Sequence, residues 1–412
     1  MAESAPRIEC IMNTPTLRFK EFSQPLQNCT FKKVIASNKY GPRFNAEDYD
    51  SDGNVKTIRG TDISLSGEIK YSQVPTAKLD DDFISDHLLE DGDLVMITTA
   101  DCGLTGVFRK QDIEYIPSAY AIKIRLNNSG CPYYFKYYLQ TKKLKDEINK
   151  YIRKGTVSNL PLSDISKLAI NLPTLPEQTK IANFLTAIDD KIAQLSQTAQ
   201  LLTDYKKGVM QQIFSQQLRF KDDDGREFAE WEEKTLGEIT EKISDNRNKK
   251  LADAKVYSVT NSNGFVLQSE HFDKVVAGND LSNYKIIQRN EFAYNPARIN
   301  VGSIAYFEND IGIISSLYVC FKTKDNLLDK FLISILELEY TKFQIENLGE
   351  GGVRIYLWYD LFALIKCKLP CIEEQTKIAN FLTAIDDKIN HNQTQLDAMK
   401  QYKAGLLQQM FV

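Results

Sequence analysis

The sequence EQTKIANFLTAIDDKI occurs twice in this chain, at Glu177–Ile192 and at Glu374–Ile389, with no difference between the two copies. The match continues more weakly on both sides: Tyr205, Lys206 and Gly208, for example, recur as Tyr402, Lys403 and Gly405, all at the same offset. An internal repeat governs the organisation of the chain that contains it. The chain is therefore a variable half, a shared segment, a second variable half and the shared segment again.

Apolar residues in each copy recur at alternating spacings of four and three, which is the pattern of a left-handed coiled coil. We predict two helices of roughly 38 residues, each about 57 Å long at 1.5 Å per residue, that pack on each other within one chain. A coiled coil between separate chains is the alternative. Three polar residues also fall in the seam, where they weaken packing but fix register: Lys206, Lys403 and Asn392. The apolar seam consists of Ile181, Leu185, Ile188, Ile192, Leu195 and Leu202, and of Ile378, Leu382, Ile385, Ile389, Leu396 and Met399.

Many identical positions lie outside the seam, and most of them are expected to face water. After Ile192 the outer positions differ freely while the seam persists, so we infer that the first turns present one surface twice, to two copies of one partner. Recent duplication is the alternative. The predicted partner-binding residues are Gln178, Lys180, Asn183, Asp189 and Lys191, with Gln375, Lys377, Asn380, Asp386 and Lys388 in the second copy.

Composition limits the class of protein. A length of 412 residues predicts two or three domains. The first sixteen residues show no signal-peptide pattern, and the longest weakly polar run, 311–321, is too short to cross a bilayer. Seven cysteines without paired spacing favour a reducing compartment, so a cytoplasmic location is expected. The net charge of -4 argues against a protein that coats nucleic acid indiscriminately.

The two variable halves share landmarks. Leu17-Arg18-Phe19-Lys20 near the start of the first returns as Leu218-Arg219-Phe220-Lys221 at the start of the second. Strand–turn–strand patterns at 54–69 and 93–107 have parallels at 256–267 and 292–306, and helical periodicity at 133–151 has a parallel at 327–343. We predict an α+β or α/β fold with two similar globular domains. The predicted segments are 1–172, 173–216, 217–369 and 370–412, in which the second and fourth are the repeat helices.

Catalytic and metal-binding patterns are weak. Asp62, Glu68 and Lys70 loosely match the two carboxylates and lysine of Mg²⁺-dependent nucleases, but a chance match in a polar hairpin is favoured. Asn295-Pro296-Ala297 lacks the second proline and the aromatic residue of the amino-group methyltransferase motif, which favours a structural turn. No phosphate-binding G-x-x-x-x-G-K-[ST] loop is present. The scattered histidines and the Cys367/Cys371 pair do not complete a zinc site. We therefore predict no catalytic residue, no metal and no cofactor bound by this chain.

Polar and basic loops are the better candidates for contacts. Arginine and asparagine pair with guanine and adenine edges, and lysine typically meets phosphate. For any single residue, a solvated surface role is the simpler interpretation, so the hypothesis depends on the paired architecture. The DNA-binding candidates are Lys39, Tyr40, Arg43, Arg59, Thr98 and Thr99 in the first half, and Arg247, Asn248, Lys249, Lys250, Asn261, Asn263, Arg298 and Asn300 in the second.

These features together resemble the specificity (S) subunit of type I restriction–modification systems. The resemblance rests on the order of variable domain and P-x-x-P-E-Q-x-K-I-A-x-F-L-x-x-I-D-x-K-I helix, which occurs twice, and on the Leu-Arg-Phe starts. The first copy begins at Pro173-Thr174-Leu175-Pro176; the second departs from the pattern only by Glu373 in place of the second proline.

The resemblance implies a division of labour. Each variable domain would be a target recognition domain that reads one half of a gapped double-stranded DNA site, and the helices would pack antiparallel and set the gap. The chain would have no activity of its own. It would bind two modification subunits that methylate adenine with S-adenosylmethionine, and two restriction subunits that use ATP with Mg²⁺ could join. Two rival hypotheses are a coiled-coil scaffold whose variable domains bind proteins, and a self-contained nuclease or methyltransferase.

Overall fold

The computed structural model describes residues 14–244, 255–261, 263–271, 281, 283–350 and 356–411. The chain divides into two compact units, one formed by 1–196 and 394–412 (unit 1) and the other by 197–393 (unit 2). Each unit thus combines one globular half with a part of both long helices. The four segment boundaries stay predictions.

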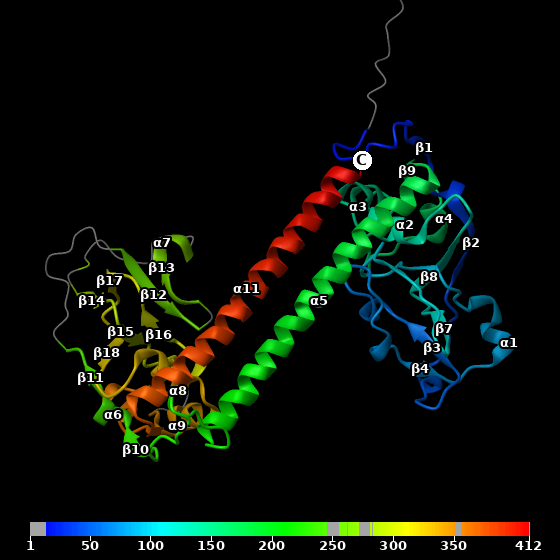
Figure 1. The fold of residues 1–412 in the computed structure, drawn as a ribbon. Coiled ribbons are helices and arrows are strands. Elements are labelled where there is room, and N and C mark those ends of the chain that lie inside the picture. The colour runs from blue at the N-terminus through cyan, green and yellow to red at the C-terminus, as the bar shows by residue number, and fades with distance from the viewer. Residues whose placement is uncertain are drawn as a thin grey trace, which may run out of the picture. The chain divides into compact units, whose positions relative to one another are not determined.

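Two uninterrupted helices run through the repeats, α5 (Leu175–Phe214, 40 residues) and α11 (Ile372–Met410, 39 residues), drawn in green and in orange to red in Figure 1. In unit 1, Ile181 and Leu185 near the start of α5 share a hydrophobic core with Leu406 near the end of α11. In unit 2, Ile213 at the end of α5 shares a core with Ile378 near the start of α11. Start packs beside end in both units, so the helices are antiparallel within each. All predicted apolar seam residues are buried or partly buried.

The seam lysines form ion pairs between the helices. In unit 2, Lys206 Nζ lies 2.8 Å from Asp386 Oδ1, and in unit 1, Lys403 Nζ lies 2.5 Å from Asp189 Oδ1. Burial alone would lower the pKa of Lys206, but hydrogen bonds to Asp386 and Glu337 outweigh it and raise the pKa above its ordinary value. The two seam lysines are therefore matched by an acidic residue of the other helix, one in each unit, and the third polar seam residue, Asn392, is buried.

Unit 1 contains a two-stranded sheet, β1-β9, a four-stranded sheet in the order β2-β8-β5-β6 and a three-stranded sheet, β4-β3-β7. All strand pairs are antiparallel except β3 with β7. Its elements before α5 are β1 (Gln27–Thr30), β2 (Ile35–Tyr40), β3 (Val55–Ile58), β4 (Thr76–Ala77), α1 (Asp81–Ile84), β5 (Leu94–Ile97), β6 (Thr105–Val107), β7 (Glu114–Pro117), β8 (Ala121–Leu126), α2 (Pro132–Tyr138), α3 (Lys142–Asn149), α4 (Leu162–Ile165) and β9 (Ala169–Leu172).

Unit 2 repeats this scaffold. Its sheets are β10-β19, β11-β18-β15-β16 and β13-β12-β17-β14, and β12 with β17 is again the parallel pair. Between the long helices it contains β10 (Glu232–Thr235), α6 (Leu236–Ile239), β11 (Thr240–Lys242), β12 (Val256–Thr260), β13 (Gly264–Leu267), α7 (Gln268–His271), β14 (Lys285–Gln288), β15 (Glu291–Tyr294), β16 (Ile304–Phe307), β17 (Ile311–Ile314), β18 (Val319–Thr323), α8 (Asp329–Glu337), α9 (Glu339–Leu348), α10 (Tyr359–Phe362) and β19 (Lys366–Leu369).

Most strand predictions are confirmed. The stretches 93–107, 256–267 and 292–306 form the hairpins β5/β6, β12/β13 and β15/β16. The stretch 54–69 forms only its first strand, β3, followed by a 3-10 turn and a single bridge between Ile63 and Ile69. The helical stretches each divide in two, α2/α3 and α8/α9. In the first, the Thr141 side chain accepts from Leu144 N and starts a new helix.

Candidate functional site

An arginine joins each globular half to the start of a long helix. In unit 1, Arg18 donates to both carboxylate oxygens of Glu177 at 2.6 and 2.7 Å; in unit 2, Arg219 donates to Glu374 at 3.3 and 2.9 Å. Both glutamates are at most 1% exposed, and each hydrogen bond to its glutamate raises the pKa of the arginine. A bidentate pair of this kind fixes geometry as well as charge. The recurring Leu-Arg-Phe words therefore have a structural role that the sequence left unassigned.

A glutamine in each repeat completes the same junction. Gln178 accepts from Cys131 N at 2.9 Å and donates to Ser129 O and Pro173 O, both at 3.0 Å. Gln375 makes the equivalent bonds with Leu328 N, Asn326 O and Pro370 O. Both glutamine side chains are 0% exposed. The prediction that Gln178 and Gln375 bind a partner is therefore wrong, because folding already uses their amides to hold the globular half on its helix.

Two more pairs of partner-binding candidates make contacts inside the chain. Lys180 pairs with Glu21 and lies over the Phe19 ring, and Lys377 lies 2.7 Å from Asp223. Asp189 and Asp386 pair with the seam lysines, as described above. Four candidates are exposed and form no hydrogen bond or ion pair among the described residues: Asn183, Lys191, Asn380 and Lys388.

In unit 1, the fold gathers several DNA-binding candidates around residues 157–162. Leu160 N donates to Thr98 O at 2.8 Å, and Leu162 N donates to the Tyr40 hydroxyl at 2.9 Å. Thr99 is partly buried and bridges to Asn159, while the Thr98 side chain is only 1% exposed and donates to Tyr120 O. Thr98 is therefore wrong as a direct base contact, since its hydroxyl is buried and satisfied.

The basic DNA-binding candidates of unit 1 differ in whether an acidic side chain pairs with them. Arg43 is exposed, Lys39 pairs with Asp86 at 2.8 Å, and Arg59 pairs with the buried Asp62 at 3.1 Å. The nuclease-like set is not assembled, because the other carboxylate, Glu68, pairs with Lys136. Among the residues that the structure describes, no cluster of three or more potential metal ligands is found.

In unit 2, the candidates Asn261 and Asn263 are exposed at the β12/β13 turn, with exposed Arg298 and partly buried Asn300 in the β15/β16 loop. The two loops meet: a side-chain carbon added at Gly302 would lie 3.7 Å from Asn261 Cβ. Gly302 has a φ of +89°, a conformation that favours glycine. Arg247, Asn248, Lys249 and Lys250 lie outside the described residues.

An exposed aromatic pair that sequence reasoning missed borders the same loop. Tyr356 and Trp358 stack with ring centroids 6.3 Å apart and an interplanar angle of 16°, and they are 37% and 49% exposed. Leu357 N between them donates to Pro296 O at 2.9 Å, the equivalent of Leu160 N to Thr98 O in unit 1. The aromatic run Tyr356-Leu357-Trp358, shortly after a glycine-rich stretch of sequence, was the signal that could have found it. In each unit, the loop after one strand of a four-stranded sheet (β5 in unit 1, β15 in unit 2) therefore lies beside the chain that follows the paired helices, α2/α3 or α8/α9.

A protein-family model matches both halves of the chain. The family model of the type I restriction modification DNA specificity domain matches residues 28–203 and 229–401. The chain belongs to this family.

Individual proteins with type I restriction names are similar to this chain in sequence or in fold. A proposed type I restriction enzyme specificity subunit (MjaX) of Methanocaldococcus jannaschii is 28% identical over 293 residues, which are 67% of this chain and 66% of that relative, just under two thirds of its length. The S subunit of a type I restriction–modification system from M. genitalium has a similar fold, with a TM-score of 0.63 and 16% identity over 97% of this chain and 99% of that chain. A structure on assembly and conformational transition of a type I system contains a chain with a TM-score of 0.52 and 15% identity, over 95% of this chain and 98% of that one.

The family fold accounts for the doubled scaffold, and the two matched segments each contain one globular half and part of a long helix. No described helix combines the length and apolar character needed to span a lipid bilayer.

Proposed function

We propose that this chain is the DNA-reading subunit of a type I restriction–modification complex. Each globular half reads one part of a bipartite, gapped site on double-stranded DNA, and the long helices set the spacing. The observation that carries the proposal is the repeated sheet order, β2-β8-β5-β6 and β11-β18-β15-β16, with different residues at the equivalent loops. One scaffold with two sets of contact residues suits a protein that reads two different half-sites.

The loop pairs are the proposed reading surfaces. In unit 2, Arg298 and Asn300 have the side chains that pair bidentately with guanine and adenine edges, and Trp358 and Tyr356 beside them offer apolar contact area. In unit 1, Thr99 and Arg43 are the candidates whose side chains are not fully committed to the fold. Lysines near these loops would meet phosphates and make the affinity fall with salt concentration.

Fewer of the identical repeat residues remain exposed for a partner than the sequence alone indicated. Asn183 and Lys191 on α5, with their counterparts Asn380 and Lys388 on α11, remain exposed after the intrachain contacts are accounted for. These identical positions support the binding of two modification subunits, one for each copy. The restriction subunits would join that assembly.

We propose that the chemistry belongs to these partners and that this chain binds no cofactor. S-adenosylmethionine would be bound by the modification subunits, and ATP with Mg²⁺ by the restriction subunits. Such a complex acts on cellular DNA, which agrees with the cytoplasmic location expected from the sequence.

The test is co-purification with the modification subunit followed by mapping of adenine methylation on genomic DNA. A two-part methylated motif with a fixed gap that disappears when this chain is deleted is the expected result. A stable complex with another protein and no such motif would instead favour the scaffold hypothesis.

A further inference from the structure

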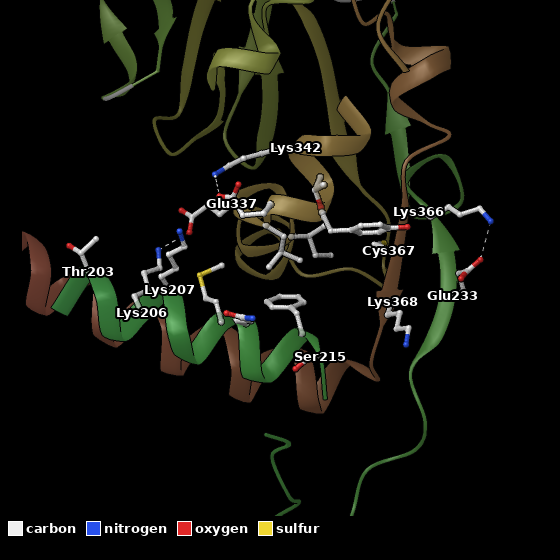
Figure 2. A pocket seen from close by; sticks show the side chains of 18 residues that line it. Thr203, Lys206, Lys207, Ser215, Glu233, Glu337, Lys342, Lys366, Cys367 and Lys368 are labelled. Carbon is white, nitrogen blue, oxygen red and sulfur yellow. Dashed lines mark hydrogen bonds and ion pairs between the residues drawn. The ribbon is translucent and has the colours of Figure 1, made fainter. Parts of the chain in front are cut away.

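Unit 2 contains a cavity of about 800 Å³ between the end of α5, the α8/α9 junction and strand β19 (Figure 2). Its apolar lining includes Met210, Phe214, Ile335 and Leu338. Lysines from α5 and from β19 stand on opposite sides of it in Figure 2. The volume lies within the range of small-molecule sites, which are mostly apolar with a few placed polar groups. The family's role in DNA reading does not require such a cavity.

Unit 1 fills the equivalent space with its own tyrosine. Tyr138 stacks on Phe411, with ring centroids 5.5 Å apart and an interplanar angle of 16°, and its hydroxyl accepts from Asn171 N at 2.9 Å. The two repeats align without a gap here. Cys131 N donates to Gln178 in unit 1, and Leu328 N donates to Gln375 at the equivalent positions of unit 2. The position of Tyr138 therefore corresponds to Ile335, which has neither the ring nor the hydroxyl.

The loss of that hydroxyl leaves a backbone donor without its acceptor. Asn171 pairs with Asn28 in β9/β1, and Lys368 pairs with Glu233 at the same register position in β19/β10. Since the Asn171 N–H points away from its partner strand to Tyr138, the Lys368 N–H points away from β10, and Lys368 lines the cavity. The Lys366 N–H two residues earlier also points away from β10, since it donates to Gln344 Oε1 at 2.8 Å, and outside the β10/β19 ladder no hydrogen bond from the Lys368 N–H occurs among the described residues.

A second exchange uncovers the start of helix α9. In unit 1 the Thr141 hydroxyl accepts from Leu144 N and caps α3; the equivalent residue in unit 2 is Leu338, which provides no side-chain cap. The N–H equivalent to that of Leu144 belongs to Thr341, and Thr341 also lines the cavity. The Thr341 side chain is only 1% exposed, and within the described ranges its hydroxyl has no hydrogen-bond partner. A helix N-terminus with open N–H groups favours an anion.

The charged side chains around the cavity leave an excess of positive charge. Lys206, Lys342 and Lys366 are paired with Glu337, Glu339 and Glu233 at 2.8, 3.0 and 3.2 Å. The other two lining lysines, Lys207 and Lys368, have no ion pair among the described residues. The cavity therefore matches a ligand with an apolar body and a negative end.

We propose that the unit 2 cavity binds a small aromatic carboxylate. The ring takes the place that Tyr138 occupies in unit 1 and packs on Phe214. The carboxylate accepts hydrogen bonds from Lys368 N–H and from the open first turn of α9, and it is balanced by Lys207. The proposal concerns ligand binding by this chain alone. Its failure would leave the proposed DNA reading untouched, and a failure of DNA reading would leave ligand binding untouched.

The test is isothermal titration of the full-length chain with phenylacetate. Saturable binding at one site per chain is expected, and phenylacetamide, which lacks the negative charge, should bind at least tenfold more weakly. A peptide with a carboxyl-terminal phenylalanine, compared with its amide, distinguishes a polypeptide end from a free aromatic acid as the source of the group. No saturable binding of phenylacetate, or equal binding of phenylacetamide, would overturn the proposal.

Variants locate the site. Ile335→Tyr installs the residue of unit 1 and should weaken binding at least tenfold, and Tyr138→Phe in unit 1 is the matched control that should leave binding unchanged. Lys368→Glu, at an exposed side chain that does not threaten folding, should also weaken binding at least tenfold. Binding that survives both Ile335→Tyr and Lys368→Glu would place the ligand elsewhere and refute the assignment.

Discussion

The junction between a globular half and its helix depends on a buried charge that one arginine compensates. Glu374 is 0% exposed and accepts from Arg219 and, at 3.0 Å, from the indole N–H of Trp231. In Arg219→Met, the indole N–H is the donor that remains to the carboxylate among the residues that the structure describes. Removing one partner of a buried ion pair costs about 3–5 kcal/mol, which is roughly a hundredfold to several thousandfold in the folding equilibrium of unit 2.

Fluorescence of Trp231 is the natural assay, because its ring is 9% exposed and contacts the altered group directly. The chain has one other tryptophan, Trp358, so measurements are made in a Trp358→Phe background with urea as the denaturant. Arg219→Met should lower the urea midpoint. Adding Glu374→Met should recover more than half of the loss, because apolar side chains replace both charges.

The other repeat supplies the control. Arg18→Met breaks the equivalent pair with Glu177 in unit 1 and should leave the Trp231 transition of unit 2 nearly unchanged, while circular dichroism reports the loss of unit 1. The reasoning is refuted if Arg219→Met leaves the Trp231 midpoint unchanged, or if the double variant is less stable than the single one. Either result would mean that the buried carboxylate does not depend on the arginine.

Three further outcomes are expected. Arg298→Ala should weaken discrimination at one base pair by about 1–3 kcal/mol and only in the half-site that unit 2 reads, measured by competition binding; relaxed readout in both halves would contradict independent reading. Lys206→Met should cost about 1 kcal/mol at neutral pH, because the acidic partners of Lys206 are nearly half exposed. Since the pKa of Lys206 is raised above 10.5 in the folded chain, this cost should be constant below that pH and shrink as pH rises through the folded value, as urea titrations at several pH values would reveal. Burial raises the pKa of Cys367 to about 12, so iodoacetamide at pH 8 should modify the partly exposed Cys371 well before Cys367, as peptide mass spectrometry would show; equal rates would contradict the burial.

The sequence predicted the long helices well because their information is local. The alternating four-and-three spacing is complete within each repeat, and it identified apolar positions such as Ile188 and Ile385 that are buried in the structure. The hairpin at 93–107 was predictable for the same reason, since alternating and turn residues lie next to each other along the chain. These elements need no distant contact to be recognised.

The uses of the identical outer residues could not be obtained in this way. Gln178 meets Cys131 from 47 positions away, and Glu177 meets Arg18 from 159 positions away, so only the folded globular half brings the partners together. Sequence reasoning assigned Gln178 to an external partner because helical periodicity gives a face but not what covers that face.

The sequence by itself determined the doubled architecture and the family, because both depend on the order and spacing of residues in the repeats. Only the tertiary structure decided which identical residues hold the chain together and which remain available to partners. It also revealed an interior difference between the repeats, where Tyr138 fills unit 1 and Ile335 leaves a cavity in unit 2. The physical reason is that a side chain's role is set by the neighbours that folding supplies, and those neighbours come from distant parts of the chain.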